Sequence, residues 1–272
     1  MRRAANQQPA PPPELGFYGK LPSRGDFVSR ALTRRFIDPW DRWLQQVMEE
    51  ADPLLWPNAD SIDRAVAGCR FALMPGVCGP EGLTGLLVPS FDRVGRRFPL
   101  TVAVALPTVT ALAGLPAALT AWFGALDSLV AACMSEQMDF EDFQEELADF
   151  DTPAMPANPP HRGPGEGIAA NVPAGQPVAA GFAPLLDSLL LDDRASPYSL
   201  WWSHPTDHDA GRVLLAQGLP APARVAEILT WQSPPLPAIL ASSLTHSPGP
   251  AGPQGAGHGP RREDDRPWRE NS

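Results

Sequence analysis

Cysteine is scarce in this chain, with three residues, Cys69, Cys78 and Cys133, among 272. The number is odd, and no two of them form a C-x-x-C pair. A disulfide framework needs paired cysteines and is typical of small secreted domains, so the sequence argues against that class of protein. We expect reduced thiols in a cytoplasmic protein. Cys69 and Cys78 should behave as small buried apolar groups and not as nucleophiles, because no histidine lies near them in the sequence.

Long apolar runs are also missing. The first residues, MRRAANQQPAPPPE, carry charge but no apolar segment of the kind found in secretory signals. The most apolar stretch, residues 101–134, is interrupted by Pro107, Gly114, Pro116 and Gly124. It therefore contains no unbroken run of the roughly 18–20 residues that a membrane helix requires. The sequence predicts a cytoplasmic protein without direct membrane insertion.

Positive charge is outnumbered, since 21 Lys and Arg face 31 Asp and Glu and give a net charge of −10. Lysine occurs once, at Lys20. This balance argues against nucleic acid as a partner, because phosphate backbones attract basic proteins. The excess acid is concentrated in residues 139–151, DFEDFQEELADFD. A solvated helix is one interpretation of this segment, and a contact with the basic face of a partner is the other.

The usual catalytic motifs are absent from the sequence. It contains no G-x-S-x-G, no P-loop, no H-E-x-x-H and no G-x-G-x-x-G. The segment HPTDHD, residues 204–209, holds two histidines four positions apart, which on a helix would suit a metal ion. Pro205 breaks that helical spacing, so a polar loop between two strands is the simpler interpretation. We therefore expect no metal site, no cofactor and no catalytic residue.

Proline and glycine divide the chain into segments. Residues 1–13 and 247–272 are polar, rich in proline or glycine, and predicted to be disordered tails. Between them, residues 14–246 are predicted to form one domain. A loose Pro/Gly-rich loop, residues 152–177, separates its core, residues 16–150, from a smaller C-terminal part, residues 178–246.

Apolar periodicity predicts the elements of the core. A helix is expected from Thr33, because Phe36, Trp40, Trp43, Leu44 and Val47 recur at three- and four-residue spacing. The segments LGFYG, CRFALM, LTGLLVPS and RFPLTVAVAL read as strands, and the last should place Phe98, Leu100, Val102 and Val104 on one side. Further helices are expected over residues 115–134 and 140–147.

The C-terminal part offers too few elements for a core of its own. Helices are predicted over residues 184–191 and 222–231, and strands in YSLWWS and RVLLAQ. These two strands should extend the sheet of the first part. The predicted class is therefore α+β, a sandwich-like arrangement in which helices pack on a central, largely antiparallel sheet.

Two polar turns are the candidate site. The first, in GFYGKLPSRGDF, offers Lys20, Ser23, Arg24 and Asp26, with Gly25 expected to supply a positive φ. The second, in PSFDRVGRRFPL, offers Asp92, Arg93 and Arg96. If the flanking strands are neighbours, the turns meet at one edge as a salt-bridged surface that presents these side chains to a partner. The alternative is two separate solvated turns without a binding role.

These same stretches resemble the TagF family, also called ImpM, of proteins associated with the type VI secretion system. The resemblance lies in GFYGKLPSRGDFV, WDRWL, RFALMPGVCG and LLVPSFDRVGRRFPLT, taken in order from residue 16 to about residue 107. SLWWS and GLPAPARVAEIL are similar to later parts of the family, more loosely.

The resemblance implies a cytoplasmic regulator without catalytic activity. It implies a post-translational repressor that binds the forkhead-associated-domain protein of the secretion system and holds it away from assembly. Some relatives carry an appended phosphatase domain, but no Asp-rich phosphatase pattern follows residue 107 here. Two alternatives stay open: a structural subunit of the apparatus, and a phosphatase-like enzyme that uses Ser23, Arg24 and Asp26 or the HPTDHD segment.

Overall fold

A computed structural model describes residues 13–55, 68–106, 112–153, 161–162, 168–169, 172, 175, 182–192, 197–203 and 211–224 of the chain. They fall within a unit that spans Met1–Ser233. The HPTDHD segment, the tail at residues 247–272 and all but Pro13 of residues 1–13 lie outside the described residues. Most of the 152–177 loop and of the helix predicted over residues 222–231 also lie outside them.

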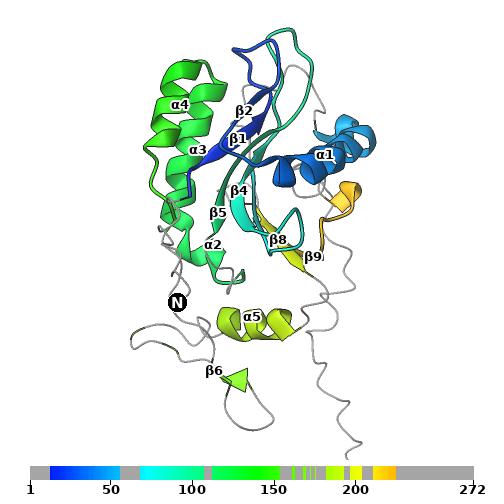
Figure 1. Cartoon of the computed structure of the whole chain (residues 1–272), viewed down its shortest axis with the longest axis vertical. Helices are drawn as coiled ribbons and strands as arrows, with labels where there is room; N and C mark the ends of the chain where they lie inside the picture. Colours follow the sequence, from blue (N-terminus) through cyan, green and yellow to red (C-terminus); the bar gives the residue numbers. More distant parts are fainter. Residues whose placement is uncertain are drawn as a thin grey trace, which may run out of the picture. The chain divides into compact units, whose positions relative to one another are not determined.

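Seven strands form one antiparallel sheet, in which strands from the second part of the chain extend those of the first (Figure 1). Their order across the sheet is β2-β1-β5-β4-β3-β8-β9. The strands are β1 Gly16–Gly19, β2 Val28–Arg30, β3 Cys69–Leu73, β4 Gly82–Val88, β5 Leu100–Leu106, β8 Tyr198–Trp202 and β9 Val213–Gln217. The predicted antiparallel sheet, with YSLWWS and RVLLAQ added to it, is confirmed.

Helices cover both faces of this sheet, with α1 on one face and α3 and α4 on the other (Figure 1). The helices are α1 Arg34–Leu55, α2 Leu115–Ala118, α3 Thr120–Met134, α4 Phe140–Ala148 and α5 Phe182–Asp192. A separate two-stranded ribbon pairs β6 His161–Arg162 with β7 Ile168–Ala169. The predicted α+β class is confirmed.

The face toward α1 is built from aromatic rings. Phe36, Trp40 and Trp43 lie on one side of the helix because their spacing matches its period. The Trp40 ring stacks on Trp201 of β8, with the ring centroids 5.9 Å apart. Its indole N–H donates to Thr101 Oγ1 at 2.9 Å, so the buried ring leaves no donor without a partner.

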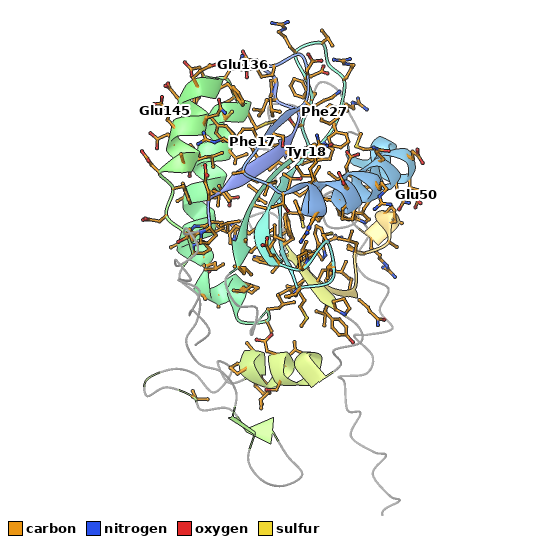
Figure 2. The ribbon with its side chains drawn as sticks, in the orientation of Figure 1. Phe17, Tyr18, Phe27, Glu50, Glu136 and Glu145 are labelled. Atoms are coloured by element: carbon orange, nitrogen blue, oxygen red, sulfur yellow. The ribbon has the colours of Figure 1, made fainter. Side chains whose placement is uncertain are left out.

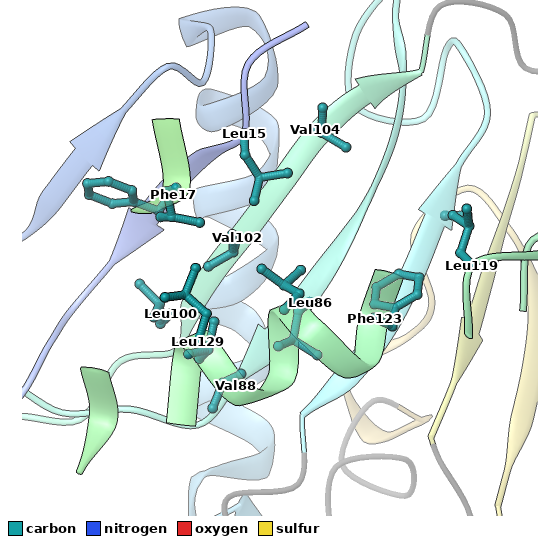
Figure 3. Close-up of a cluster of buried hydrophobic side chains, with 14 of the residues drawn as sticks. Leu15, Phe17, Leu86, Val88, Leu100, Val102, Val104, Leu119, Phe123 and Leu129 are labelled. Carbon is teal, nitrogen blue, oxygen red and sulfur yellow. The ribbon is translucent and has the colours of Figure 1, made fainter. Parts of the chain in front are cut away.

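The opposite face is packed by α3 and α4 (Figure 3). Phe123 of α3 meets Trp202 edge to face at a centroid distance of 5.3 Å. Phe143 of α4 packs on Phe17 of β1 at 5.8 Å. Leucine and valine side chains from the sheet fill the space between these rings: Leu86, Val88, Leu100, Val102 and Val104.

An ion pair between a buried arginine and a partly exposed aspartate crosses the same face. Arg70 of β3 is 4% exposed, and its Nη2 lies 2.5 Å from Oδ2 of Asp127 on α3. Its guanidinium also lies over the Phe123 ring, 5.0 Å from the centroid. Because a buried cation without a partner is costly, Asp127 adds a polar contact to the apolar packing of α3 on the sheet.

Two details of the prediction are wrong. Phe98 packs with the α1 face, whereas Leu100, Val102 and Val104 pack with the α3 face. The reason is that β5 begins only at Leu100, so alternation does not extend back through Pro99. The helix expected over residues 115–134 is two helices that meet at Leu119, whose φ of −102° and ψ of 15° are not helical.

One carboxylate connects α5 to the segment before α2. Asp187 is 2% exposed, and its Oδ1 accepts a hydrogen bond from the Ala113 amide at 2.8 Å. Burial raises the pKa of Asp187 to about 6, against the lowering effect of the backbone amides around Ala113.

No helix among the described residues is both long and apolar enough to cross a membrane.

Replacing Trp201 by alanine should lower the free energy of unfolding by about 3–5 kcal/mol, because the ring is fully buried between Trp40, Trp43 and Phe71. Urea unfolding followed by circular dichroism measures this loss. Val213→Ala is the control: its side chain is 71% exposed, so the change should stay within about 0.5 kcal/mol. Equal losses for the two variants would contradict this packing.

Asp187 should make stability fall as pH rises from about 4 to about 6. The pKa of this carboxyl is higher in the folded state, about 6, than in the unfolded chain, so the folded state holds its proton longer. Asp187→Asn keeps the acceptor for the Ala113 amide but does not ionise. The difference in stability between the two proteins, from urea unfolding at several pH values, should change by about 2 kcal/mol over that range and stay constant above it. A difference that does not vary with pH would refute this.

Candidate functional site

The two polar turns lie side by side at one end of the sheet. Strand β1 pairs antiparallel with β5, in the register Tyr18↔Thr101, so the turn that follows β1 meets the loop that precedes β5. Gly19 permits this approach: a Cβ there would lie 2.1 Å from the Pro99 carbonyl oxygen, and its φ of 143° also disfavours other residues. The expectation that the turns meet at one edge is confirmed. We call residues 20–27 and 89–97 together the joined turns.

The carboxylate of Asp92 holds the joined turns together. It is fully buried, and Lys20 Nζ lies 3.0 Å from its Oδ2. Within its own turn, Oδ1 accepts from the Val94 amide at 3.1 Å and the Arg96 amide at 2.9 Å. The Arg96 Nε donates to Oδ2 at 2.7 Å. Two cations and two amides therefore converge on one buried anion.

Hydrogen bonding decides the protonation of Asp92. Burial alone would raise the pKa of this carboxyl. The Arg96 amide, the side chains of Lys20 and Arg96, and the Val94 amide outweigh burial and hold the pKa of Asp92 well below its usual range. The carboxylate thus stays charged at any pH near neutrality, and its ion pairs with Lys20 and Arg96 persist over the same range.

Backbone contacts join the turns directly. The Arg93 amide donates to the Arg24 carbonyl at 2.8 Å, and Arg96 Nη2 donates to the Gly25 carbonyl at 2.6 Å. Behind them, the buried Ser90 hydroxyl donates to the Lys20 carbonyl at 2.7 Å. These bonds cross between segments some seventy residues apart and set the turns in one fixed arrangement.

Helix α4 supports the first turn from the other side. Arg24 forms an ion pair with Glu141, and its guanidinium lies over the Phe140 ring, 4.3 Å from the centroid. At the end of β2, Arg30 Nη1 donates to the Gln144 carbonyl of α4 at 3.0 Å. The start of the acidic segment is thus bound to the protein's own arginines. Farther along the segment, Glu145 is exposed and points away from the sheet (Figure 2).

The seven predicted site residues divide by exposure. Asp26, Arg93 and Arg96 are exposed, and Ser23 and Arg24 are half-buried. Lys20 and Asp92 are buried, so the expectation that they present their side chains to a partner is wrong. They pair with each other because two turns that pack together bury the charges between them. Gly25 also lacks the expected positive φ; Gly95, with a φ of 83°, has it instead.

Two exposed apolar side chains also belong to this surface, although they were not among the predicted site residues. Phe27 is 50% exposed and Val94 is 69% exposed. The Phe27 ring packs on Tyr18 at 5.8 Å and on Phe98 at 4.8 Å, and it lies beside Tyr18 next to the strands (Figure 2). The signal in the sequence was the position of Phe27 directly after a polar turn. An aromatic residue next to a strand is ordinarily predicted to be in the core.

Tyr18 is occupied by a structural contact. Its hydroxyl donates to Asp41 Oδ1 of α1 at 2.5 Å. Burial, together with the nearby Asp41 carboxylate, raises the pKa of the Tyr18 hydroxyl above its ordinary value. Tyr18 therefore anchors α1 to β1 and gives Phe27 a rigid aromatic base.

No group of three or more potential metal ligands occurs among the described residues. Burial raises the pKa of Cys78 to about 12 and that of Cys133 to about 11, so these thiols stay protonated near neutral pH. The buried Ser23 Oγ has no hydrogen-bond partner among the described residues, so no base in that part of the chain activates it.

Comparison with known proteins decides the family. Residues 16–150 match the family described as TagF N-terminal domain, type VI secretion system-associated. The chain belongs to the TagF family. A solved structure, PA0076 from Pseudomonas aeruginosa PAO1, is similar with a TM-score of 0.63 and 34% identity, over 82% of this chain and 97% of that one. The search of curated proteins gave no significant match.

Membership makes this chain a type VI secretion system-associated protein. The matched residues 16–150 contain both joined turns, α1, α3 and α4. The TagF chain also carries β8 and β9 outside that range, and they complete the same sheet. The likeness to PA0076 extends past the family domain as well, because it covers more of the chain than residues 16–150.

Replacing Asp92 should destabilise the protein, whereas replacing its neighbour Arg93 should not. Asp92→Ala leaves the buried Lys20 ammonium without its carboxylate and removes the acceptor of two amides. Thermal unfolding should show a clearly lower midpoint for Asp92→Ala. Arg93→Ala, at an exposed side chain, should change the free energy of unfolding by no more than about 0.5 kcal/mol. An unchanged midpoint for Asp92→Ala would disprove the role of this carboxylate.

Proposed function

We propose that this TagF chain is a cytoplasmic, non-catalytic repressor of the type VI secretion system. It binds the forkhead-associated-domain protein of that system and keeps it from taking part in assembly of the secretion machine. The contact is made by the exposed side chains of the joined turns. In this proposal Asp26, Arg93 and Arg96 touch the partner with Phe27 and Val94, while Lys20 and Asp92 hold the surface in shape.

The observation that carries the proposal is a surface whose backbone is held in place before any partner arrives. The Arg93 amide is held by the Arg24 carbonyl, and the Arg96 guanidinium by Asp92 and Gly25. A prearranged surface loses little conformational entropy on binding, so more of its contact energy appears as affinity. Arginine and aromatic side chains are also the residue types enriched in protein interfaces.

The chemistry of the turns favours binding over catalysis. The polar groups there are used to join the turns: Asp92 is saturated with donors, and Arg24 is committed to Glu141 and Phe140. The half-buried Ser23 has no activating base among the described residues. A hydrolytic role would need a nucleophile, a base and an oxyanion site at the same place.

The direct test is a binding titration of the purified full chain against the forkhead-associated-domain protein of the same secretion system. The partner is used in phosphorylated and unphosphorylated forms. We expect saturable binding to both, and secretion should rise when the TagF gene is deleted. No binding to either form would contradict the proposal, as would co-purification of the chain with the assembled apparatus.

The same titration should separate the joined turns from the other end of the sheet. Arg93→Glu should weaken binding by about tenfold or more, because it reverses the charge of an exposed side chain in the proposed contact. Arg35→Glu is the control, because it changes the net charge by the same amount at an exposed residue of α1. Arg35 lies near Gly79, which belongs to the loop between β3 and β4. That loop lies at the other end of the sheet, so this variant should bind as the wild type does.

A further inference from the structure

The joined turns carry positive charge in a chain that is acidic as a whole. The joined turns, residues 20–27 and 89–97, contain five basic residues, Lys20, Arg24, Arg93, Arg96 and Arg97, against two acidic ones, Asp26 and Asp92, in a chain of net charge −10. One end of the sheet therefore differs in charge from the average of the protein. Charge of this sign attracts an anionic partner and repels a basic one.

Arg93 is the least committed of these cations. Its backbone amide is fixed by the Arg24 carbonyl, but its guanidinium has no hydrogen-bond or ion-pair partner in the part of the chain that the structure describes. The guanidinium lies near Gly25, with Nη2 3.6 Å from where a Cβ of that residue would stand. An exposed planar cation above a fixed turn is well suited to a carboxylate, which it can contact through two N–H groups.

Apolar surface accompanies the charge. Val94 follows Arg93 directly and is 69% exposed, and half of the Phe27 side chain is open to solvent. Lys20 Nζ lies 5.1 Å from the centroid of the Phe27 ring, and the ring is held by Tyr18 and Phe98, so it cannot fold away into the core. The surface thus combines cations with exposed apolar groups.

We propose that the joined turns bind a protein segment in which aspartate or glutamate residues alternate with apolar side chains. The carboxylates pair with Arg93 and with the exposed part of Arg96, whose side chain is 60% exposed. The apolar side chains pack on Phe27 and Val94. This inference rests on the proposed function, because it names the kind of segment by which the forkhead-associated-domain protein is bound.

Two features favour an acidic protein segment over nucleic acid as the occupant. The apolar part of the surface, Phe27 and Val94, gains from side chains that a phosphate backbone does not offer. The acidic carboxylates of α4 also begin beside the first turn, where Glu141 pairs with Arg24, and they repel a long polyanion. A short acidic and apolar segment fits within the cationic part.

The test uses fluorescence anisotropy with the full-length chain and a labelled peptide of alternating glutamate and leucine. The matched probe has glutamine in place of glutamate. We expect saturable binding of the glutamate peptide that weakens as salt is raised, and binding at least about tenfold weaker for the glutamine peptide. Arg93→Glu should reduce affinity for the glutamate peptide by about tenfold or more, and Arg35→Glu should leave it unchanged.

Other outcomes overturn the inference. It fails if the glutamine peptide binds equally well, if Arg35→Glu weakens binding as much as Arg93→Glu, or if single-stranded DNA of equal charge displaces the peptide as readily as unlabelled peptide does. Circular dichroism of both variants confirms that they are folded. Should Arg93→Glu lower stability, Arg93→Gln, which removes only the charge, should still weaken binding of the glutamate peptide, and no loss there refutes the proposal.

The same variants separate this inference from the proposed function. If the wild type and Arg93→Glu bind the forkhead-associated-domain protein equally, the inference is wrong and the repressor function stands. If the wild type binds the glutamate peptide through Arg93 but does not bind the forkhead-associated-domain protein, the function is wrong and the assignment of an acidic segment to this surface stands.

Discussion

The buried carboxylate of Asp92 is the interaction on which the candidate surface depends. A single anion, removed from water, is surrounded by the Lys20 ammonium, the Arg96 guanidinium and two backbone amides. Desolvation of such a group is costly, and only a complete set of donors offsets the cost. Each of these donors therefore stabilises the contact between the turns.

The core beneath the turns gives them a rigid base. Gly19 lets β1 come close to Pro99, and Tyr18 ties β1 to Asp41 on α1. On the other face, Phe17 packs against Phe140 and Phe143 of α4. Since β1 is held from both faces, the turn that follows it starts from a fixed point. A binding surface made of turns gains its precision from strands in this way.

The helices and strands of the core were largely predictable from the sequence, whereas the exposure of the residues in the turns was not, for physical reasons. The period of Phe36, Trp40 and Trp43 located α1, and the alternation in β5 located the sheet. Exposure in the turns was not predictable, because burial of Lys20 and Asp92 depends on which segment packs against each, and composition suggests solvent for both. Phe27 shows the reverse case: an aromatic residue next to a strand reads as core, yet half of it faces solvent.

Hydrogen–deuterium exchange of the full TagF chain, alone and with the forkhead-associated-domain protein, shows whether the joined turns form a fixed surface that the partner covers. We expect slow exchange of the Arg93 and Arg96 amides in the free chain, because both are hydrogen-bonded. In the complex, exchange should slow further across residues 91–97, with residues 76–80 at the other end of the sheet unchanged. Fast exchange of these amides in the free chain, or slowing confined to α4 or to residues 76–80, would contradict this expectation.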